Sequence, residues 1–199
     1  MDDLLVVGGG PVGLATALHA ARAGLTVSVL ERRVGPVDKA CGEGLMPAAV
    51  ADLHDLGVAE ELMRGGMPIT GITYVSGHRQ VTAPFSGGEG LGVRRTHLAS
   101  VLAAAVARAG ISVHHGTAVE VLPESRRVGV VEADGRARFA RHVVAADGLH
   151  SPVRHLLGLD ARPPRRPEGD RHGLRRHVRV APWTSCVEVH WGALAEAYV

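Results

Sequence analysis

A glycine-rich string near the N-terminus places the strongest constraint on the fold of this 199-residue chain. Residues 8–13 read G-G-G-P-V-G and contain the pattern G-x-G-x-x-G at Gly8, Gly10 and Gly13. The string follows residues 4–7, an uninterrupted apolar run that is typical of a strand buried on both faces. Alone, the pattern also fits a glycine-rich turn that opens an ordinary helix, so the residues after it decide between the two interpretations.

The residues after this string complete a β-α-β unit. Apolar residues recur at three- and four-residue spacing over 14–21, which predicts a helix, and Gly24 stands where a helix commonly ends. Residues 25–30 form a second strand-like run that ends at Glu31. Strand, glycine pattern, helix, second strand and acid therefore follow one another as in a dinucleotide-binding fingerprint.

Each glycine of the pattern has a physical role in such a site. Gly8 permits the tight turn, Gly10 lets the backbone approach a diphosphate, and Gly13 lets helix and strand pack closely. The start of the helix, at Pro11 and Val12, brings backbone N–H groups and the positive end of the helix dipole to the diphosphate. These residues are the predicted diphosphate site.

The acid at the end of the second strand suits a ribose. Glu31 can accept hydrogen bonds from both ribose hydroxyls of an adenosine, and its charge would repel a 2′-phosphate. FAD and NAD therefore fit this site better than NADP, and the neighbouring Arg32 is a further candidate contact. The fingerprint alone does not separate FAD from NAD.

Three later strings bear on that choice, and the first lies shortly after the acid. Residues 38–45 read D-K-A-C-G-E-G-L and contain Lys39, the only lysine of the chain. Read alone, Lys39 is a solvated loop residue, and Cys41 is a small buried apolar residue rather than a reactive thiol.

The second string lies in the middle of the chain. The pattern R-x-x-L-x-x-x-L falls on Arg95, Leu98 and Leu102, within a predicted helix that has Thr96 as its N-cap and ends at Gly110. The third string follows an apolar, strand-like run and reads D-G-x-x-S-x-x-R over residues 147–154. Asp-Gly after a strand is a common turn, so the specificity lies in the longer string.

Together with the opening unit, these strings resemble the FAD-binding domain of the para-hydroxybenzoate hydroxylase superfamily. That superfamily includes class A flavoprotein monooxygenases and geranylgeranyl reductase-like enzymes. The first string is similar to the K-x-C-G-x-G-[IL] stretch of the reductase-like branch. The resemblance implies that the dinucleotide is FAD and that Lys39, Cys41 and Gly42 lie beside the flavin.

The resemblance also implies roles for residues of the later strings. Arg95 corresponds to an arginine that reaches FAD, and Val119 to a position that meets the adenine. Val119 would otherwise be ordinary strand core. Asp147 and Gly148 correspond to a pair near the FAD diphosphate and the NAD(P)H electron donor. No residue can be nominated as a catalytic acid or base, because the cofactor would carry the chemistry.

The expected fold is α/β, with a Rossmann-type FAD site at the carboxyl edge of a parallel sheet. A hairpin over 127–140 would form a small β excursion from that sheet. The FAD-binding domain is expected over 1–160, and 161–199 would be a linker and the start of an antiparallel substrate domain. In that domain we expect strands over 174–180 and 187–191, where residues alternate in polarity.

Several other classes of function are disfavoured by composition. A basic, proline-broken stretch over 162–179 could be a linker or a phosphate-binding patch, but aromatic residues make up only 3 % of the chain, few for stacking on nucleic acid. The twelve histidines form no metal-ligand pattern. No apolar run reaches the length of a membrane-spanning helix, about 18 residues. Cys41 and Cys186 form no C-x-x-C pair, which fits a reducing cytoplasm.

The function expected from the resemblance is an FAD-dependent oxidoreductase. Its first form is a monooxygenase in which NAD(P)H reduces the flavin and an apolar or aromatic small molecule is hydroxylated. The alternative is a geranylgeranyl reductase-like reduction of carbon–carbon double bonds, to which the first string points. A further alternative is a non-catalytic dinucleotide-binding fragment of a longer enzyme, because the third superfamily signature, a G-D-A string, is absent from the sequence. The sequence does not identify the substrate, the nicotinamide preference or the oligomeric state.

Overall fold

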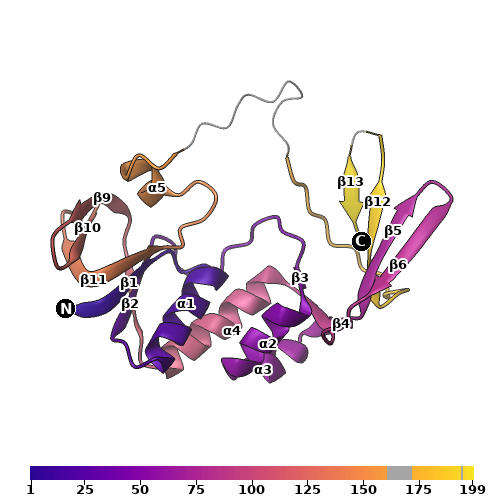
Figure 1. Ribbon diagram of the computed structural model, residues 1–199, viewed down its shortest axis with the longest axis horizontal. Helices are drawn as coiled ribbons and strands as arrows, with labels where there is room; N and C mark the ends of the chain where they lie inside the picture. The colour runs from indigo at the N-terminus through magenta and orange to yellow at the C-terminus, as the bar shows by residue number, and fades with distance from the viewer. Residues whose placement is uncertain (161–171, 194) are drawn as a thin grey trace. The chain divides into compact units, whose positions relative to one another are not determined.

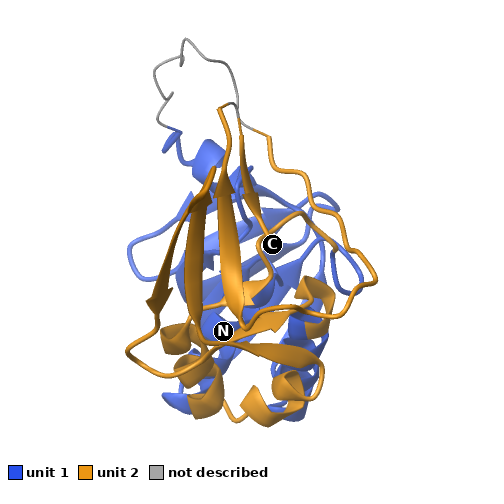
Figure 2. Cartoon of the chain, turned by 90° about the vertical axis from the view of Figure 1, so that its right-hand side faces the viewer, with its two compact units in different colours: residues 1–37, 98–171 blue, residues 38–97, 172–199 orange. Residues whose placement is uncertain are grey.

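The computed structural model describes residues 1–160, 172–193 and 195–199. The chain divides into two compact units, coloured separately in Figure 2. Unit 1 comprises Met1–Val37 and Leu98–Arg171, and unit 2 comprises Asp38–His97 and His172–Val199. The run of arginine and proline over 162–167 lies outside the described residues. The domain boundary near residue 160 stays a prediction, and the grouping of 38–97 with 172–199 was not anticipated from the sequence.

Unit 1 is built on one six-stranded sheet with the strand order β8-β2-β1-β11-β10-β9 (Figure 1). The strands in this order are Ser112–His115, Val27–Glu31, Asp2–Val7, Ala137–Ala145, Val128–Glu132 and Ala118–Pro123. The first four run parallel, whereas β10 pairs antiparallel with both β11 and β9. The predicted parallel sheet with a β excursion is therefore confirmed.

The core of unit 1 follows from apolar residues that the sequence pattern places inward. Leu5 and Val7 of β1 and Leu30 of β2 form one buried cluster with Ala118, Val130, Ala140 and Val153. Helix α1, Pro11–Arg22, packs on β1 and β2 through its buried residues Gly13, Leu14, Ala17 and Leu18. Burying both faces of β1 accounts for its uninterrupted apolar sequence.

The two long helices end as predicted, but one begins earlier than expected. Gly24, with φ of 83°, follows α1, and Gly110, with φ of 70°, follows α4, which spans Arg95–Arg108. After each helix, backbone N–H groups bond back to carbonyls of the last turn, which is a Schellman ending. The prediction of Thr96 as N-cap is wrong, because α4 begins at Arg95 and so includes Thr96 in its first turn.

Unit 2 contains two smaller sheets. One has the order β3-β7-β4, formed by Gly44–Leu45, Gly90–Val93 and Gly66–Ile69, with the helices α2, Pro47–Asp55, and α3, Ala59–Met63. The other has the order β13-β12-β5-β6, formed by Glu196–Tyr198, Cys186–Trp191, Gly71–Ser76 and Arg79–Pro84. The pairs β5–β6 and β12–β13 are antiparallel, whereas β12 and β5 run parallel, so the sheet is mixed rather than purely antiparallel.

The strand expected over 174–180 is not formed. Residues 172–180 lie outside helices and strands, and the Leu174 side chain is 99 % exposed. The alternation that suggested a strand has another cause: Arg175 and His177 turn toward carboxylates of unit 2, as described below. The expected strand over 187–191 is confirmed within β12.

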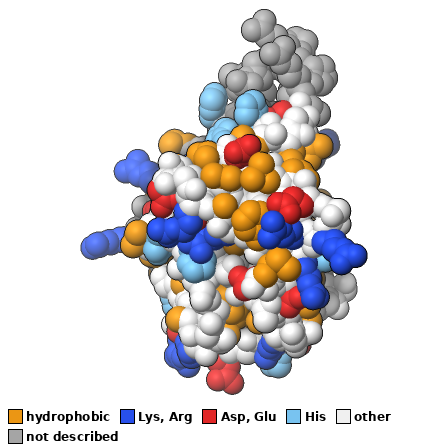
Figure 3. Space-filling view, turned by 90° about the vertical axis from the view of Figure 1, so that its left-hand side faces the viewer, with side chains coloured by type: hydrophobic (Ala, Val, Ile, Leu, Met, Phe, Trp, Pro, Cys, Tyr) orange, Lys and Arg blue, Asp and Glu red, His pale blue; other side chains and the backbone are white. Residues whose placement is uncertain are grey.

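One face of the molecule and the helices bear on whether the chain has a charged binding surface or a membrane span. On the face drawn in Figure 3, basic and acidic side chains are interspersed with apolar ones. None of the helices in the described residues combines the length and the apolar character that crossing a membrane requires.

Candidate dinucleotide site

The glycine-rich turn between β1 and α1 is packed so closely that two of its positions have no room for a side chain. A Cβ at Gly8 would overlap the Ala146 carbonyl oxygen and lie 2.8 Å from the Asp147 Cα, and Gly8 has φ of 109°. A Cβ at Gly13 would overlap the Gly8 carbonyl oxygen. The turn therefore lies directly against the start of the D-G-x-x-S-x-x-R string, although 138 residues separate Gly8 from Ala146.

The first turn of α1 presents backbone N–H groups. Gly10 is the N-cap and has no side chain to cap the turn, while Pro11 occupies the first helical position. The N–H groups of the residues that follow have no carbonyl four positions earlier within the helix. Val12 is 72 % exposed, so this turn is open to a ligand. An anionic diphosphate is the chemistry that such a helix start favours.

The carboxylate of Glu31 lies against the glycine-rich turn. Its Oε2 accepts a hydrogen bond from the Gly9 N–H at 2.5 Å, and its Oε1 accepts one from the Arg33 N–H at 2.8 Å. The acid at the end of β2 is thus fixed beside the turn by two backbone donors. Arg32, the other candidate here, is exposed.

Asp147 has one carboxylate oxygen engaged and one unpaired. Oδ2 accepts a hydrogen bond from the Val153 N–H at 3.0 Å, at the start of helix α5, Pro152–Leu156. Ser151 caps the same helix by accepting from the Arg154 N–H at 3.0 Å. Oδ1 is buried and has no hydrogen-bond partner among the described residues. A buried oxygen of this kind, beside Gly8, fits a site that a bound molecule completes.

Two further candidates, Gly148 and Val119, also lie in unit 1. Gly148 follows Asp147 with φ of 94°, a conformation that glycine adopts without strain. Val119 of β9 is 45 % exposed, so it is not ordinary strand core. Its predicted contact with adenine stays a prediction.

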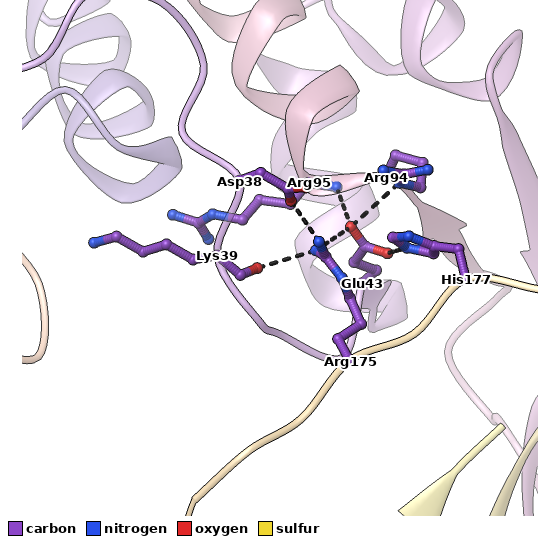
Figure 4. Close-up of polar contacts among 7 residues, drawn as sticks. All are labelled: Asp38, Lys39, Glu43, Arg94, Arg95, Arg175 and His177. Atoms are coloured by element: carbon purple, nitrogen blue, oxygen red, sulfur yellow. Dashed lines mark hydrogen bonds and ion pairs between the residues drawn. The ribbon is translucent and has the colours of Figure 1, made fainter.

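In unit 2, residues 38–43 form a loop before β3. Cys41 is an exposed free thiol, which corrects the expectation that it is a small buried residue. A Cβ at Gly42 would meet nothing within 4 Å, so this glycine is not required by packing. Lys39 is exposed, and Figure 4 shows its side chain directed away from the other labelled residues. Its carbonyl oxygen accepts a hydrogen bond from Arg175 Nη1 at 3.0 Å.

Glu43 is the residue that sequence reasoning missed. Its Oε1 accepts hydrogen bonds from the Arg95 backbone N–H and from Arg175 Nη1, both at 2.9 Å. Its Oε2 lies 2.6 Å from His177 Nε2, and Arg94 Nε lies 3.6 Å from Oε1 (Figure 4). Glu43 is thus where the first string, the start of α4 and the segment 175–177 meet. The one available signal was an acid inside the recognised K-x-C-G-x-G stretch.

These contacts control the protonation of two carboxyls. Burial is the largest single influence on the pKa of Glu43 and raises it, but the hydrogen bonds from His177 and the Arg95 N–H, with the charge of Arg175, lower it overall. The pKa of Asp38 is lowered chiefly by its hydrogen bond from Arg175 Nη2, at 2.6 Å. Both acids are therefore held as carboxylates at neutral pH.

The lowered pKa of Glu43 predicts a specific acid sensitivity. A carboxyl whose folded-state pKa is depressed contributes its full stability above its ordinary value, 4.5, and loses it as the pH falls through the lower folded value. We expect the urea midpoint of the unaltered chain to fall more steeply below about pH 4.5 than that of a Glu43→Gln chain. Urea unfolding followed by circular dichroism across this range measures both slopes. Equal slopes for the two chains would contradict the lowered pKa of Glu43 in the folded state.

The fold and the glycine-rich turn define a dinucleotide-binding domain of the Rossmann type. Residues 1–190 match the family described as FAD binding domain, and the chain belongs to that family. The predicted superfamily resemblance is confirmed, and the family supports FAD over NAD.

Named relatives agree with this assignment. The menaquinone reductase of Mycobacterium tuberculosis (strain ATCC 25618 / H37Rv) is 36 % identical over 165 residues, covering 78 % of this chain and 40 % of the relative. The 6-methylpretetramide 4-monooxygenase of Streptomyces rimosus is 36 % identical over 173 residues, covering 79 % and 41 %. The crystal structure of p-nitrophenol 4-monooxygenase PnpA from Pseudomonas putida DLL-E4 shares the fold, with a TM-score of 0.70, 24 % identity, and coverage of 79 % and 44 %. The chain spans about two fifths of the length of these curated relatives.

Proposed function

We propose that the chain holds FAD and supports an NAD(P)H-linked monooxygenation of an apolar or aromatic small molecule. The observation that carries the cofactor proposal is the packing of Gly8 and Gly13 against residues 146–147, which leaves an open helix start beside a buried, unpaired Asp147 oxygen. An anionic diphosphate supplies what the helix start favours, and an ordered water on it can supply a donor to Asp147.

The residues of unit 1 divide the adenosine and diphosphate parts of the cofactor between them. The α1 start, at Pro11 and Val12, would hold the diphosphate, and Glu31 would accept from the ribose hydroxyls. On the family resemblance, Lys39, Cys41 and Gly42 are the proposed contacts of the flavin part, and Arg95 is a further proposed contact of FAD. FAD, when bound, supplies the electron transfer and the activation of oxygen, while the protein binds, orients and excludes water.

A hollow on the β6-β5-β12 sheet of unit 2 supports an aromatic substrate. It has a volume of about 140 Å³ and is lined by Tyr74, Val75, Ser76, Arg79, Val81 and Trp191. The rings of Tyr74 and Trp191 meet edge to face, with centroids 6.0 Å apart. The exposed rings of Tyr74 and Trp191 give this open hollow an aromatic wall, on which an apolar or aromatic substrate could pack.

A second candidate is a flavin-dependent reductase. It is favoured by the exposed Cys41 within the K-x-C-G string and by the 36 % sequence identity to a menaquinone reductase. In this reaction the reduced flavin would pass electrons to the substrate, and oxygen would not be consumed.

Oxygen dependence separates the two candidates. The FAD-loaded chain is mixed with NADH or NADPH and either p-nitrophenol or menaquinone, with and without oxygen. We expect nicotinamide oxidation that requires both oxygen and the phenol. Anaerobic oxidation that requires menaquinone would replace the proposal with the reductase. Bound FAD with no turnover in any arm would leave a dinucleotide-binding module and overturn the proposed activity.

A further inference from the structure

The backbone of Glu43 adopts a conformation that a glycine would adopt more easily. With φ of 52°, Glu43 is the one non-glycine residue at positive φ among those the structure describes. Such a conformation is unfavourable for a residue with a Cβ and persists only where its surroundings enforce it. Glycines flank the position on both sides, at 42 and 44. We therefore infer that a glutamate is kept at this unfavourable position because its carboxylate binds neighbouring groups.

That carboxylate fixes a loop that has little other structure. Residues 38–43 belong to no helix or strand, and β3 begins only at Gly44. The Glu43 side chain is 13 % exposed and receives donors from α4 and from the segment 175–177. Arg175 closes the loop further, because its guanidinium also binds Asp38 Oδ1 and the Lys39 carbonyl. Side chains rather than a sheet ladder hold the loop.

Charges around the loop are matched within unit 2. The carboxylates of Asp38 and Glu43 face the guanidinium of Arg175, with Arg94 and His177 on the side of Glu43 (Figure 4). Removing the Glu43 charge weakens the contacts from Arg175, His177 and the Arg95 N–H. Arg175 keeps its bonds to Asp38 and the Lys39 carbonyl, so we expect the loop to loosen rather than to detach. Ordering the loop again would then oppose ligand binding, since conformational entropy lost on binding lowers affinity.

We propose that Glu43 is a positioning residue that preorganises the loop 38–44 for the flavin part of FAD. The inference rests on the proposed function, because it takes this loop as the flavin contact. It extends that function by assigning a role to a residue that touches neither the glycine-rich turn nor Glu31 in the described contacts. The adenosine part of the cofactor should not depend on Glu43.

Two ligands separate positioning from a general loss of structure. The dissociation constants of FAD and of ADP are measured for the unaltered chain and for the Glu43→Gln and Glu43→Gly variants. Glu124→Gln, which breaks the exposed ion pair with Arg127 in unit 1, is the matched control. We expect both Glu43 variants to bind FAD roughly tenfold more weakly, because hydrogen bonds to a charged group are lost, and to bind ADP as the unaltered chain does. The glycine variant relieves the backbone strain, so its weaker FAD binding would not reflect a strained fold.

Three results would overturn this inference. Unchanged FAD affinity in both Glu43 variants would show that the loop needs no such anchor. Equal losses of FAD and ADP affinity would show that Glu43 supports the fold rather than the flavin contact. Failure of the unaltered chain to bind FAD would overturn the proposed function and this inference with it.

Discussion

The Gly13→Ala chain should lose FAD binding and unfold at a lower temperature than the unaltered chain. The new Cβ would overlap the Gly8 carbonyl oxygen, which is backbone at the centre of the turn and cannot rotate away. The turn and the start of α1 would have to separate, at a cost of about 1–3 kcal/mol that is typical of overpacking. Thermal unfolding and FAD titration measure the two effects.

Gly87→Ala is the matched control for this substitution. A Cβ at Gly87 would meet nothing within 4 Å, and no positive φ is required there. The control should keep both its stability and its affinity. A Gly13→Ala chain that binds FAD as well as the control does would show that the close turn is not part of the site.

The second large effect is expected at Glu31. Glu31→Ala removes the acceptor proposed for the ribose and also the carboxylate that receives the Gly9 and Arg33 N–H groups. Losing hydrogen bonds to a charged group costs about 1–3 kcal/mol, which corresponds to roughly five- to 150-fold weaker binding. Calorimetric titration with FAD measures this change.

The exposed Glu89 provides the comparison for Glu31, because both changes remove one carboxylate. Glu89→Ala should leave the FAD affinity unchanged. If the Glu31→Ala chain also retains full affinity, Glu31 lies outside the site, and the bonds to Gly9 and Arg33 only shape the turn.

Local patterns were enough to predict unit 1. The apolar run 4–7, the glycine pattern and Glu31 are consecutive, and their order specifies a β-α-β unit with little dependence on the rest of the chain. The hairpin of β10 and β11 could also be predicted locally, because the turn residues 133–135 lie between the two segments that form its strands. The resemblance placed both the glycine-rich turn and Asp147 near the diphosphate. The close packing of Gly8 against Ala146 is a finding of the structure.

The pairing of strands that lie far apart in the chain could not be predicted from the sequence. Strand β12 pairs with β5 across more than 100 residues, and no local pattern specifies such a partner. The alternation over 174–180 suggested a strand that does not form, because period-two alternation does not distinguish strand pairing from side chains that bind elsewhere. Glu43 was hidden for a similar reason: its partners at 94–95 and 175–177 come from distant parts of the chain.

The central claim is that this chain binds FAD, and the visible absorption of the purified protein tests that claim most directly. The purified chain is incubated with FAD or with NAD, passed through a desalting column, and examined by absorption and thermal unfolding. We predict a yellow protein that retains flavin and whose unfolding temperature is raised by FAD. A colourless protein whose unfolding temperature is raised by NAD and not by FAD would contradict the claim.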